Sequence, residues 1–319
     1  MSKKIAILGA GYAGIKAAKT LNKKFRKDDS VEINLIDQHS HHTLLTELHE
    51  VAGNRIESNG VKISLEDIFS GSKVNIIKDK INNINSDQQK LISETEEYDY
   101  DYLVLGIGSE PAHFNIPGMK EHAFTLWSLD DAQEINNHIR NMFKLAANET
   151  DLDKRKEMLT FVIGGGGFTG VETAGEIAEW ADKLCEQYNI SPKEVSIKIV
   201  EVQNGILPNL GDNLSQQAAE YLTQELKVEL LTEASICEVN NDSIIINNCS
   251  KEDGYITDTS NQAEKINSKT LIWTGGIKAK ELVKQIGVEL NHRDRIEVNS
   301  YLQTSIDNIY AVGDNAYFE

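Results

Sequence analysis

Glycines at a fixed spacing follow an apolar, strand-like run near the start of the chain. After Lys4–Leu8 comes a G-x-G-x-x-G pattern, and apolar residues at helical spacing begin at Ile15. The pattern comprises Gly9, Ala10, Gly11, Tyr12, Ala13 and Gly14. The first glycine makes a tight turn, the second lets backbone approach a pyrophosphate, and the third lets helix and strand pack closely. The amide groups at the helix start then favour phosphate, so the stretch predicts a dinucleotide site.

An acidic residue stands where a ribose would lie in such a site. The strand-like run Val31–Ile36 is followed by Asp37, 23 residues beyond Gly14, and a carboxylate there can accept from a ribose hydroxyl. Gln38 and His39 follow it. This full context favours a bound nucleotide over a glycine-rich turn without a ligand.

Four histidines between His39 and His49 invite a metal hypothesis. The segment contains no cysteine and no pair of histidines at helical spacing with a general base, so we expect no metal site. A loop leading into a helix that lies over a bound cofactor is the favoured interpretation.

The next strands end in glycines. We expect strands at 74–77 and 81–92, the latter a hairpin, and a buried strand from Tyr100 to Leu105 that breaks at Gly106 and Gly108. These glycines would let main chain approach a ligand, although an ordinary exit from a strand remains the alternative. Asp130–Ala147 has the apolar stripe of a packed helix, and 148–157 is expected to be a charged surface loop.

A second glycine pattern opens the second half of the chain. A strand-like run at 159–163 precedes it, a helix is expected from Val171 towards Cys185, and the next strand ends in Glu201. The second pattern comprises Gly165, Gly166, Gly167, Phe168, Thr169 and Gly170. The acid favours NAD, because it would repel a 2′-phosphate, which arginine normally receives.

The two halves repeat one another. Residues 228–231 correspond to 74–77, 236–246 to the hairpin at 81–92, and 269–277 to the strand that ends at Gly106 and Gly108. Two copies of one nucleotide-binding architecture imply two dinucleotides, and hydride exchange between them.

Composition narrows the class of protein. The 319 residues suggest two or three domains, and the net charge of −18 argues against nucleic acid and anionic lipid as electrostatic partners. The 3 cysteines, widely spaced and without a CxxC pair, suggest a reducing compartment. No apolar run approaches the length of a membrane span, and no signal-peptide cleavage pattern follows the first strand.

Three segments resemble a known family. Phe161–Glu176 is similar to the NADH site of the type II NADH:quinone oxidoreductases, and Thr46–Gly53 to that family's threonine-and-LHE segment beside the flavin. Asn308–Asp314 resembles the late FAD motif of the wider superfamily of flavoproteins with two dinucleotide-binding domains, which includes glutathione reductase. The resemblance spans essentially the whole chain.

The resemblance implies an α/β fold with two Rossmann-like, glutathione-reductase-like domains, the second inserted in the first. The FAD domain would comprise 1–117 plus 288–319, and the NADH domain 118–287. The expected FAD residues are Gly9, Gly11, Tyr12, Ala13, Gly14, Asp37, Gln38, His39, Thr46, Ile81, Gly106, Gly108, Ser109, Gly313 and Asp314. The expected NAD residues are Gly165, Gly167, Phe168, Thr169, Gly170, Glu172, Glu201, Gly275 and Gly276.

Glu172 is the one residue to which the resemblance gives a role at the reacting ring. It would bind the nicotinamide carboxamide, and Glu201 the adenosine ribose. The alternative for Glu172 is an acidic residue in the first turn of a helix, stabilised by the helix dipole. We expect no general base, because hydride transfer between stacked rings depends mostly on positioning.

The implied activity is an FAD-dependent NADH dehydrogenase that passes electrons to menaquinone or ubiquinone in a respiratory chain. An NADH-dependent ferredoxin or diaphorase-type reductase is the alternative enzyme, and a flavin-binding redox sensor without turnover is the alternative outside enzymes. A sulfide:quinone reductase is disfavoured, because no cysteine lies between Met1 and Trp180. The resemblance implies a cytoplasmic protein and leaves a homodimer open.

The sequence departs from the family pattern at its end. Glu319 follows soon after Asp314, so the helix expected after Gly-Asp has no counterpart, and neither do the glutamine-containing quinone motif or the amphipathic membrane-anchoring helices. We therefore expect an engineered truncation or a natural fragment. Peripheral association with the cytoplasmic face of a membrane is expected only of the full-length family.

Overall fold

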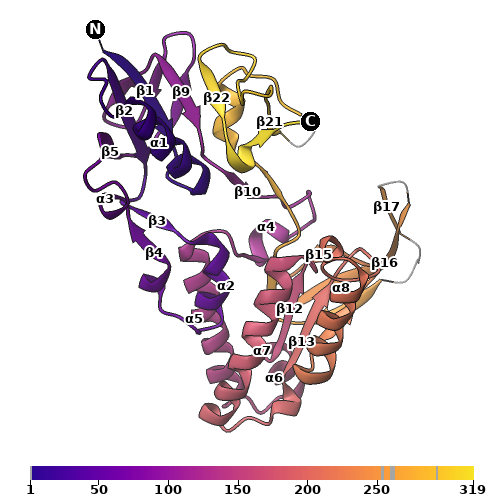
Figure 1. Cartoon of the computed structure of the whole chain (residues 1–319). Helices are drawn as coiled ribbons and strands as arrows, with labels where there is room; N and C mark the ends of the chain where they lie inside the picture. The colour runs from indigo at the N-terminus through magenta and orange to yellow at the C-terminus, as the bar shows by residue number, and fades with distance from the viewer. Residues whose placement is uncertain (1, 253–254, 259–262, 292–293) are drawn as a thin grey trace. The chain divides into compact units, whose positions relative to one another are not determined.

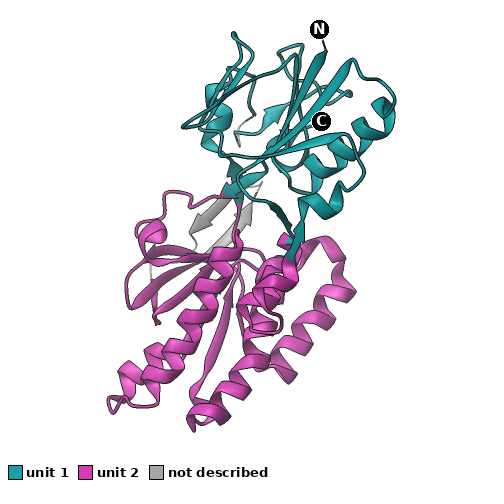
Figure 2. Ribbon diagram, turned by 90° about the vertical axis from the view of Figure 1, so that its left-hand side faces the viewer, with its two compact units in different colours: residues 1–44, 62–110, 277–319 teal, residues 45–61, 111–276 magenta. Residues whose placement is uncertain are grey.

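The structure is a computed structural model that describes residues 2–252, 255–258, 263–291 and 294–319. Its contacts divide the chain into two compact units, coloured separately in Figure 2. Unit 1 comprises Met1–Leu44, Lys62–Glu110 and Ile277–Glu319, and unit 2 comprises Leu45–Val61 and Pro111–Gly276. The borders between the units therefore lie at 110 and 276, whereas the domain borders expected from the sequence were 117 and 287. No sequence pattern indicated that 45–61 belongs with unit 2.

A five-stranded parallel sheet forms the centre of unit 1, in the order β22-β9-β1-β2-β5 (Figure 1). Its strands are β1 (Lys3–Leu8), β2 (Val31–Asp37), β5 (Val74–Lys78), β9 (Tyr102–Leu105) and β22 (Ile309–Ala311). The register pairs Ile7 with Leu35 on one side and with Val104 on the other. Because all five strands are parallel, their carboxyl ends meet at one edge of the sheet, where ligands bind in open α/β folds.

Unit 2 contains a second parallel sheet, in the order β11-β19-β12-β13-β14. Its strands are β11 (Phe124–Thr125), β12 (Thr160–Gly164), β13 (Ser196–Val200), β14 (Glu229–Leu231) and β19 (Thr270–Trp273). When β12 is matched to β1, the neighbours β19, β13 and β14 fall in the places of β9, β2 and β5. The predicted internal repeat is confirmed by this shared topology.

Each unit also has an antiparallel part that follows the third strand of its repeat. In unit 1 it comprises β6 (Asn83–Asn85), β7 (Lys90–Ile92) and β8 (Glu97–Asp99). In unit 2 it comprises β15 (Ala234–Val239), β16 (Ser243–Glu252), β17 (Tyr255–Asp258) and β18 (Glu264–Asn267). The hairpins predicted at 81–92 and 236–246 lie here, and a register shift between Ile236 and Glu238 interrupts the second one.

The helices connect the strands. They are α1 (Tyr12–Phe25), α2 (Leu48–Ala52), α3 (Leu65–Ile68), α4 (Met119–His122), α5 (Leu129–Ala146), α6 (Leu152–Met158), α7 (Phe168–Tyr188) and α8 (Asp212–Glu220). The loop predicted over 148–157 is wrong, because α6 occupies most of it. Asp151 caps α6 by accepting from the amides of Asp153 and Lys154. Since α6 has no fully buried residue, no apolar stripe marks it in the sequence.

Short elements complete the chain. They are β3 (His41–Thr43), β4 (Lys62–Ser64), β10 (Ser109–Pro111), β20 (Ile277–Ala279), β21 (Ile296–Glu297), β23 (Ala316–Tyr317), the 3-10 turns η1 (Leu45–Glu47), η2 (Ser58–Val61), η3 (Pro192–Glu194), η4 (Pro208–Leu210), η6 (Glu281–Gln285) and η7 (Gly313–Asn315), and the π turn η5 (Tyr221–Glu225). The strands among them pair as β3 with β4, β10 with β20, and β21 with β23.

The long helix α5 covers part of the unit 2 sheet. Ser128 and Asp131 form a capping box at its start, which satisfies amides that the helix leaves unpaired. Its predicted apolar stripe is buried, and Phe143 stacks on Phe161 of β12 with ring centroids 5.8 Å apart. The packing role predicted for this helix is therefore confirmed.

Acid is expected to destabilise unit 2 through His138 of α5. Burial lowers the pKa of His138 from 6.5 to about 4. Between these two pH values the unfolded chain binds a proton that the folded protein does not, so the free energy of unfolding falls as the pH falls through that window. The loss is at most about 3 kcal/mol. Urea unfolding of wild type and His138→Gln at pH 7 and pH 4.5 would measure it; equal pH dependence in both proteins would contradict this assignment.

Candidate nucleotide-binding sites

The first glycine loop, residues 9–14, joins β1 to α1 and leaves the helix start uncapped. Gly11 is the N-cap residue of α1, no side chain caps it, and the first turn contains no acidic residue. The first amides of a helix have no partner within the helix, and a side-chain cap usually satisfies some of them. The free amides at the start of α1, together with the positive end of the helix dipole, can therefore bind a phosphate.

Two glycines of this loop meet different surroundings. A Cβ on Gly14 would lie 1.9 Å from the carbonyl oxygen of Gly9, so this position requires glycine for the helix to pack on the strand. A Cβ on Gly11 would have no atom nearer than the carbonyl oxygen of Gly106, at 4.0 Å. Gly14 thus serves packing, and Gly11 borders open space that a pyrophosphate could occupy.

Asp37 holds the first glycine loop in place from the end of β2. Its Oδ2 accepts from the Ala10 amide at 2.7 Å, and its Oδ1 accepts from the His39 amide at 2.8 Å. Buried His42 lies beside it, with Nδ1 3.0 Å from the Ala10 carbonyl oxygen and its ring edge-on to Tyr12. The sequence identified Asp37, but His42 stood out only as one of four clustered histidines.

Further predicted residues gather at the carboxyl ends of β9 and β22. These are Gly106, Gly108, Ser109, Gly313 and Asp314. A Cβ on Gly313 would lie 2.9 Å from Cβ of Ala13, which brings the end of β22 against the start of α1. Fully buried Asn315 accepts from the Gly108 amide at 3.3 Å and donates to the Leu105 carbonyl at 3.1 Å, fixing the exit of β9. Sequence reasoning missed Asn315, although it directly follows the Gly-Asp pair.

Three other predicted FAD residues are not part of this group. Gln38 is exposed just past β2. Ile81 is buried in the core beside Ile84 and Leu91 of the antiparallel part. Thr46 lies in η1, which belongs to unit 2.

The second glycine loop, residues 165–170, repeats the first. Gly167 is an N-cap residue without a side-chain cap, and the first turn of α7 again contains no acidic residue. A Cβ on Gly170 would lie 1.9 Å from the carbonyl oxygen of Gly165, whereas a Cβ on Gly167 would meet nothing within 4 Å. The residue after the N-cap glycine is an exposed aromatic in both loops, Tyr12 at 47% and Phe168 at 48% exposure. The two loops thus offer similar surfaces to a ligand.

In unit 2, Glu201 has the position that Asp37 has in unit 1. It is buried at 7% exposure, and its two oxygens accept from the amides of Gly166 at 2.6 Å and Gln203 at 2.8 Å. A buried carboxylate at this position opposes a second negative charge, which supports NAD over NADP.

The glycines after β19 are packed around Trp273. A Cβ on Gly275 would lie 2.4 Å from the indole ring, and one on Gly276 would lie 2.8 Å from the ring of Phe114. The indole Nε1 donates to the Ala112 carbonyl at 2.8 Å, and Thr274 Oγ1 donates to the Gly164 carbonyl at 2.9 Å. Trp273 and Thr274 were not predicted as site residues; they shape the turn that contains the predicted glycines.

Glu172 lies on α7, two residues beyond the second glycine loop. The helix begins at Phe168, earlier than the predicted Val171, so Glu172 is outside the first turn and the alternative role as an N-terminal acidic residue is excluded. His49 Nδ1 lies 3.6 Å from its Oε2. Burial raises the pKa of Glu172, as do Glu47, Glu176 and Glu50, and His49 opposes them.

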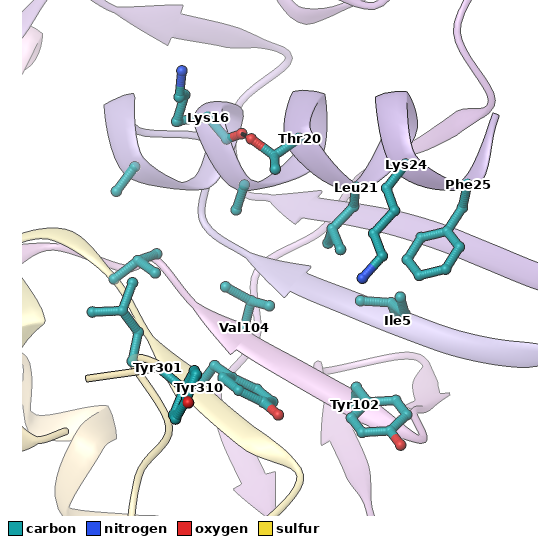
Figure 3. A pocket seen from close by; sticks show the side chains of 14 residues that line it. Ile5, Lys16, Thr20, Leu21, Lys24, Phe25, Tyr102, Val104, Tyr301 and Tyr310 are labelled. Atoms are coloured by element: carbon teal, nitrogen blue, oxygen red, sulfur yellow. Dashed lines mark hydrogen bonds between the residues drawn. The ribbon is translucent and has the colours of Figure 1, made fainter. Parts of the chain in front are cut away.

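The structure also contains an apolar cavity of about 700 Å³ on the sheet of unit 1 (Figure 3). Leu21 and Phe25 of α1 line one side, Val104 and Tyr310 belong to β9 and β22, and Lys16 and Lys24 contribute charge. In unit 2 the corresponding face, between α7 and β11, is covered by α5.

Among the described residues, no group of histidine, cysteine, aspartate or glutamate side chains could hold a metal ion. Of the described helices, none is both long and apolar enough to cross a membrane.

Comparison with protein families gives a match over residues 3–319, to the model described as pyridine nucleotide-disulphide oxidoreductase. Among curated proteins, the type II NADH:quinone oxidoreductase of Staphylococcus aureus NCTC 8325 is 30% identical over 317 residues, which cover 99% of this chain and 75% of that protein. The same protein from strain COL matches equally.

Solved structures share the fold. NDH2 from Plasmodium falciparum in complex with NADH has a TM-score of 0.87 at 23% identity, covering 100% of this chain and 65% of that one. The sulfide:quinone oxidoreductase of Aquifex aeolicus has a TM-score of 0.75 at 17% identity, covering 99% of this chain and 69% of that one. The chain thus spans about two thirds of the length of the NDH2 structure.

Proposed function

Because the chain belongs to the type II NADH:quinone oxidoreductases of the pyridine nucleotide-disulphide oxidoreductase family, we propose that it oxidises NADH through FAD and passes the electrons to a quinone. FAD, when bound, supplies the hydride acceptor and the store for two electrons. The single observation that carries the proposal is the duplicated site: two glycine loops, each with an uncapped helix and an acid at the next strand end.

We assign FAD to unit 1. The amides at the start of α1 would bind its pyrophosphate, Asp37 its ribose, and the turns after β9 and β22 would approach it closely. Gly11 supports a pyrophosphate at this loop, because the space beside it is open while the packing glycine Gly14 is tightly surrounded.

We assign NADH to unit 2. The amides at the start of α7 would bind the pyrophosphate, Glu201 the adenosine ribose, and Glu172 the carboxamide of the nicotinamide. Glu172 supports this role by its place on the same helix and by its half-exposed carboxylate, with 46% of the side chain accessible. These residues orient the donor ring and need not move a proton in the hydride step.

We propose a quinone as acceptor because the relatives carry that name. Despite the family description, we infer that a disulfide is not the acceptor, because the stretch 1–180, which contains the first glycine loop, has no cysteine. We propose a cytoplasmic location. An NADH-dependent ferredoxin-type reductase is the competing enzyme.

Anaerobic addition of NADH to the flavin-loaded protein is expected to bleach the visible flavin band. NADPH should act more slowly at equal concentration, because Glu201 repels its additional phosphate. A spectrum that NADH leaves unchanged, while dithionite still reduces the flavin, would instead favour a sensor without turnover. Steady-state rates with menadione and with a one-electron protein acceptor would then separate the quinone reductase from the ferredoxin-type enzyme.

A further inference from the structure

The segment 45–61 is anchored to unit 2 through its short helix α2. Helix α2 packs against α5 and α7. Asn136 of α5 donates to the carbonyls of Val51 and Ala52 at 3.1 and 3.3 Å, which satisfies the end of α2. Beyond it, a Cβ on Gly53 would lie 2.4 Å from Cβ of Glu176, so the backbone of the segment touches α7 directly.

An ion-pair clamp fixes the same segment just past α2. Arg55 donates from Nε to Glu176 at 2.8 Å, contacts its other oxygen at 2.7 Å, and reaches Glu179 at 3.0 Å. The side chain of Glu176 is only 10% exposed, and the bidentate geometry gives both strength and orientation. Glu176 raises the pKa of Arg55 further, so the guanidinium stays charged at every working pH.

This anchoring directs His49 of α2 at the carboxylate of Glu172. The imidazole is 14% exposed, and its Nδ1 lies 3.6 Å from Oε2 of Glu172. The charged groups that act on Glu172 come from both packed elements: Glu47, His49 and Glu50 from η1 and α2, and Glu176 from α7 itself. Glu176 is already paired with Arg55. Of these groups, His49 is the one whose interaction favours the ionised carboxylate.

We propose that His49 is a positioning residue for Glu172: it orients the carboxylate and keeps it ionised, so that Glu172 accepts a hydrogen bond from the amide of the nicotinamide carboxamide. The inference rests on the proposed binding of NADH in unit 2. A protonated Glu172 would present a hydroxyl instead of an acceptor on one oxygen, which weakens recognition of a group that donates. His49 acts through Glu172 and does not touch the reacting ring.

Replacement of His49 by glutamine is expected to raise KM for NADH about tenfold, with kcat at saturating NADH changed little, because the contact that orients the carboxylate of Glu172 is lost. The acid limb of kcat/KM should shift to higher pH, since removing His49 raises the pKa of Glu172. Glu50→Gln should shift the same limb to lower pH, because it removes a like charge. The measurement is the pH profile of NADH oxidation by flavin-loaded protein with menadione.

The Glu172→Gln variant tests whether His49 acts on NADH binding through Glu172. In that background His49→Gln should change neither KM nor the acid limb further, because the positioned carboxylate is already gone. Flavin content and thermal midpoint of each variant control for folding. If His49→Gln does not fold, His49→Asn removes the same imidazole with a smaller side chain and is measured in its place.

The outcomes separate the two proposals. Wild-type protein that binds flavin but is not reduced by NADH would refute the proposed function. Active wild type together with a His49→Gln variant of unchanged KM and pH profile would overturn the role of His49 alone.

Discussion

Gly14→Ala is expected to abolish FAD binding and to destabilise unit 1. The added Cβ would lie 1.9 Å from the Gly9 carbonyl oxygen and 3.7 Å from Cγ2 of Ile7, so backbone must shift and α1 must move off β1. Overpacking of this kind costs about 3 kcal/mol. Flavin content after purification and the urea midpoint would measure both effects.

Gly11→Ala is the matched control within the first glycine loop. Its Cβ has room, and its backbone at φ −71° and ψ −175° is extended, so the loss of stability should be limited to the about 1 kcal/mol that alanine costs at an N-cap. Flavin binding should nevertheless weaken, because the methyl group occupies the space assigned to the pyrophosphate. A Gly11→Ala variant that retains flavin with wild-type affinity would contradict the placement of FAD at this loop.

Gly170→Ala is expected to eliminate reduction by NADH while the protein keeps its flavin. Its Cβ would meet the Gly165 carbonyl oxygen at 1.9 Å and Thr274 Oγ1 at 2.9 Å, which distorts the second glycine loop and destabilises unit 2 by about 3 kcal/mol. Stopped-flow reduction of the flavin by NADH measures the loss, and dithionite reduction shows that the flavin remains competent.

Two glycine variants, one at the N-cap of α7 and one within the helix, serve as controls. Gly167→Ala, with nothing within 4 Å of its Cβ, should fold normally and still lose NADH affinity, since it fills the approach to the phosphates. Gly175→Ala, whose Cβ would meet only Leu226 Cδ1 at 3.8 Å, should retain both flavin and activity. Loss of flavin in Gly170→Ala with unit 2 still folded would reverse the assignment of the two nucleotides.

The glycine loops and the acids after them could be predicted from the sequence because their constraints are local. Gly14 and Gly170 each oppose a carbonyl only a few residues away, and Asp37 and Glu201 follow apolar strands directly. Such spacing is the same wherever the motif occurs. The order of the two sheets followed from the repeat, since each strand of one had a recognisable partner in the other.

What could not be predicted depends on contacts between distant segments. Helix α6 has no buried stripe and is defined by the cap at Asp151, so its charges resembled those of a loop. Asn315 acquires its role from Gly108 and Leu105, some two hundred residues earlier in the chain. His49 acquires its partner only because Arg55 and Asn136 hold the segment 45–61 against α5 and α7.

The membership of 45–61 in unit 2 has a consequence for dissecting the protein. The polypeptide passes between the units at 44, 61, 110 and 276, so neither unit is one continuous piece. Expressed alone, 111–276 would lose the arginine that pairs with Glu176 and would expose the faces of α5 and α7 against which α2 packs. A separately expressed unit 2 therefore has to include 45–61 joined to 111–276, because 45–61 lies between two segments of unit 1 in the sequence.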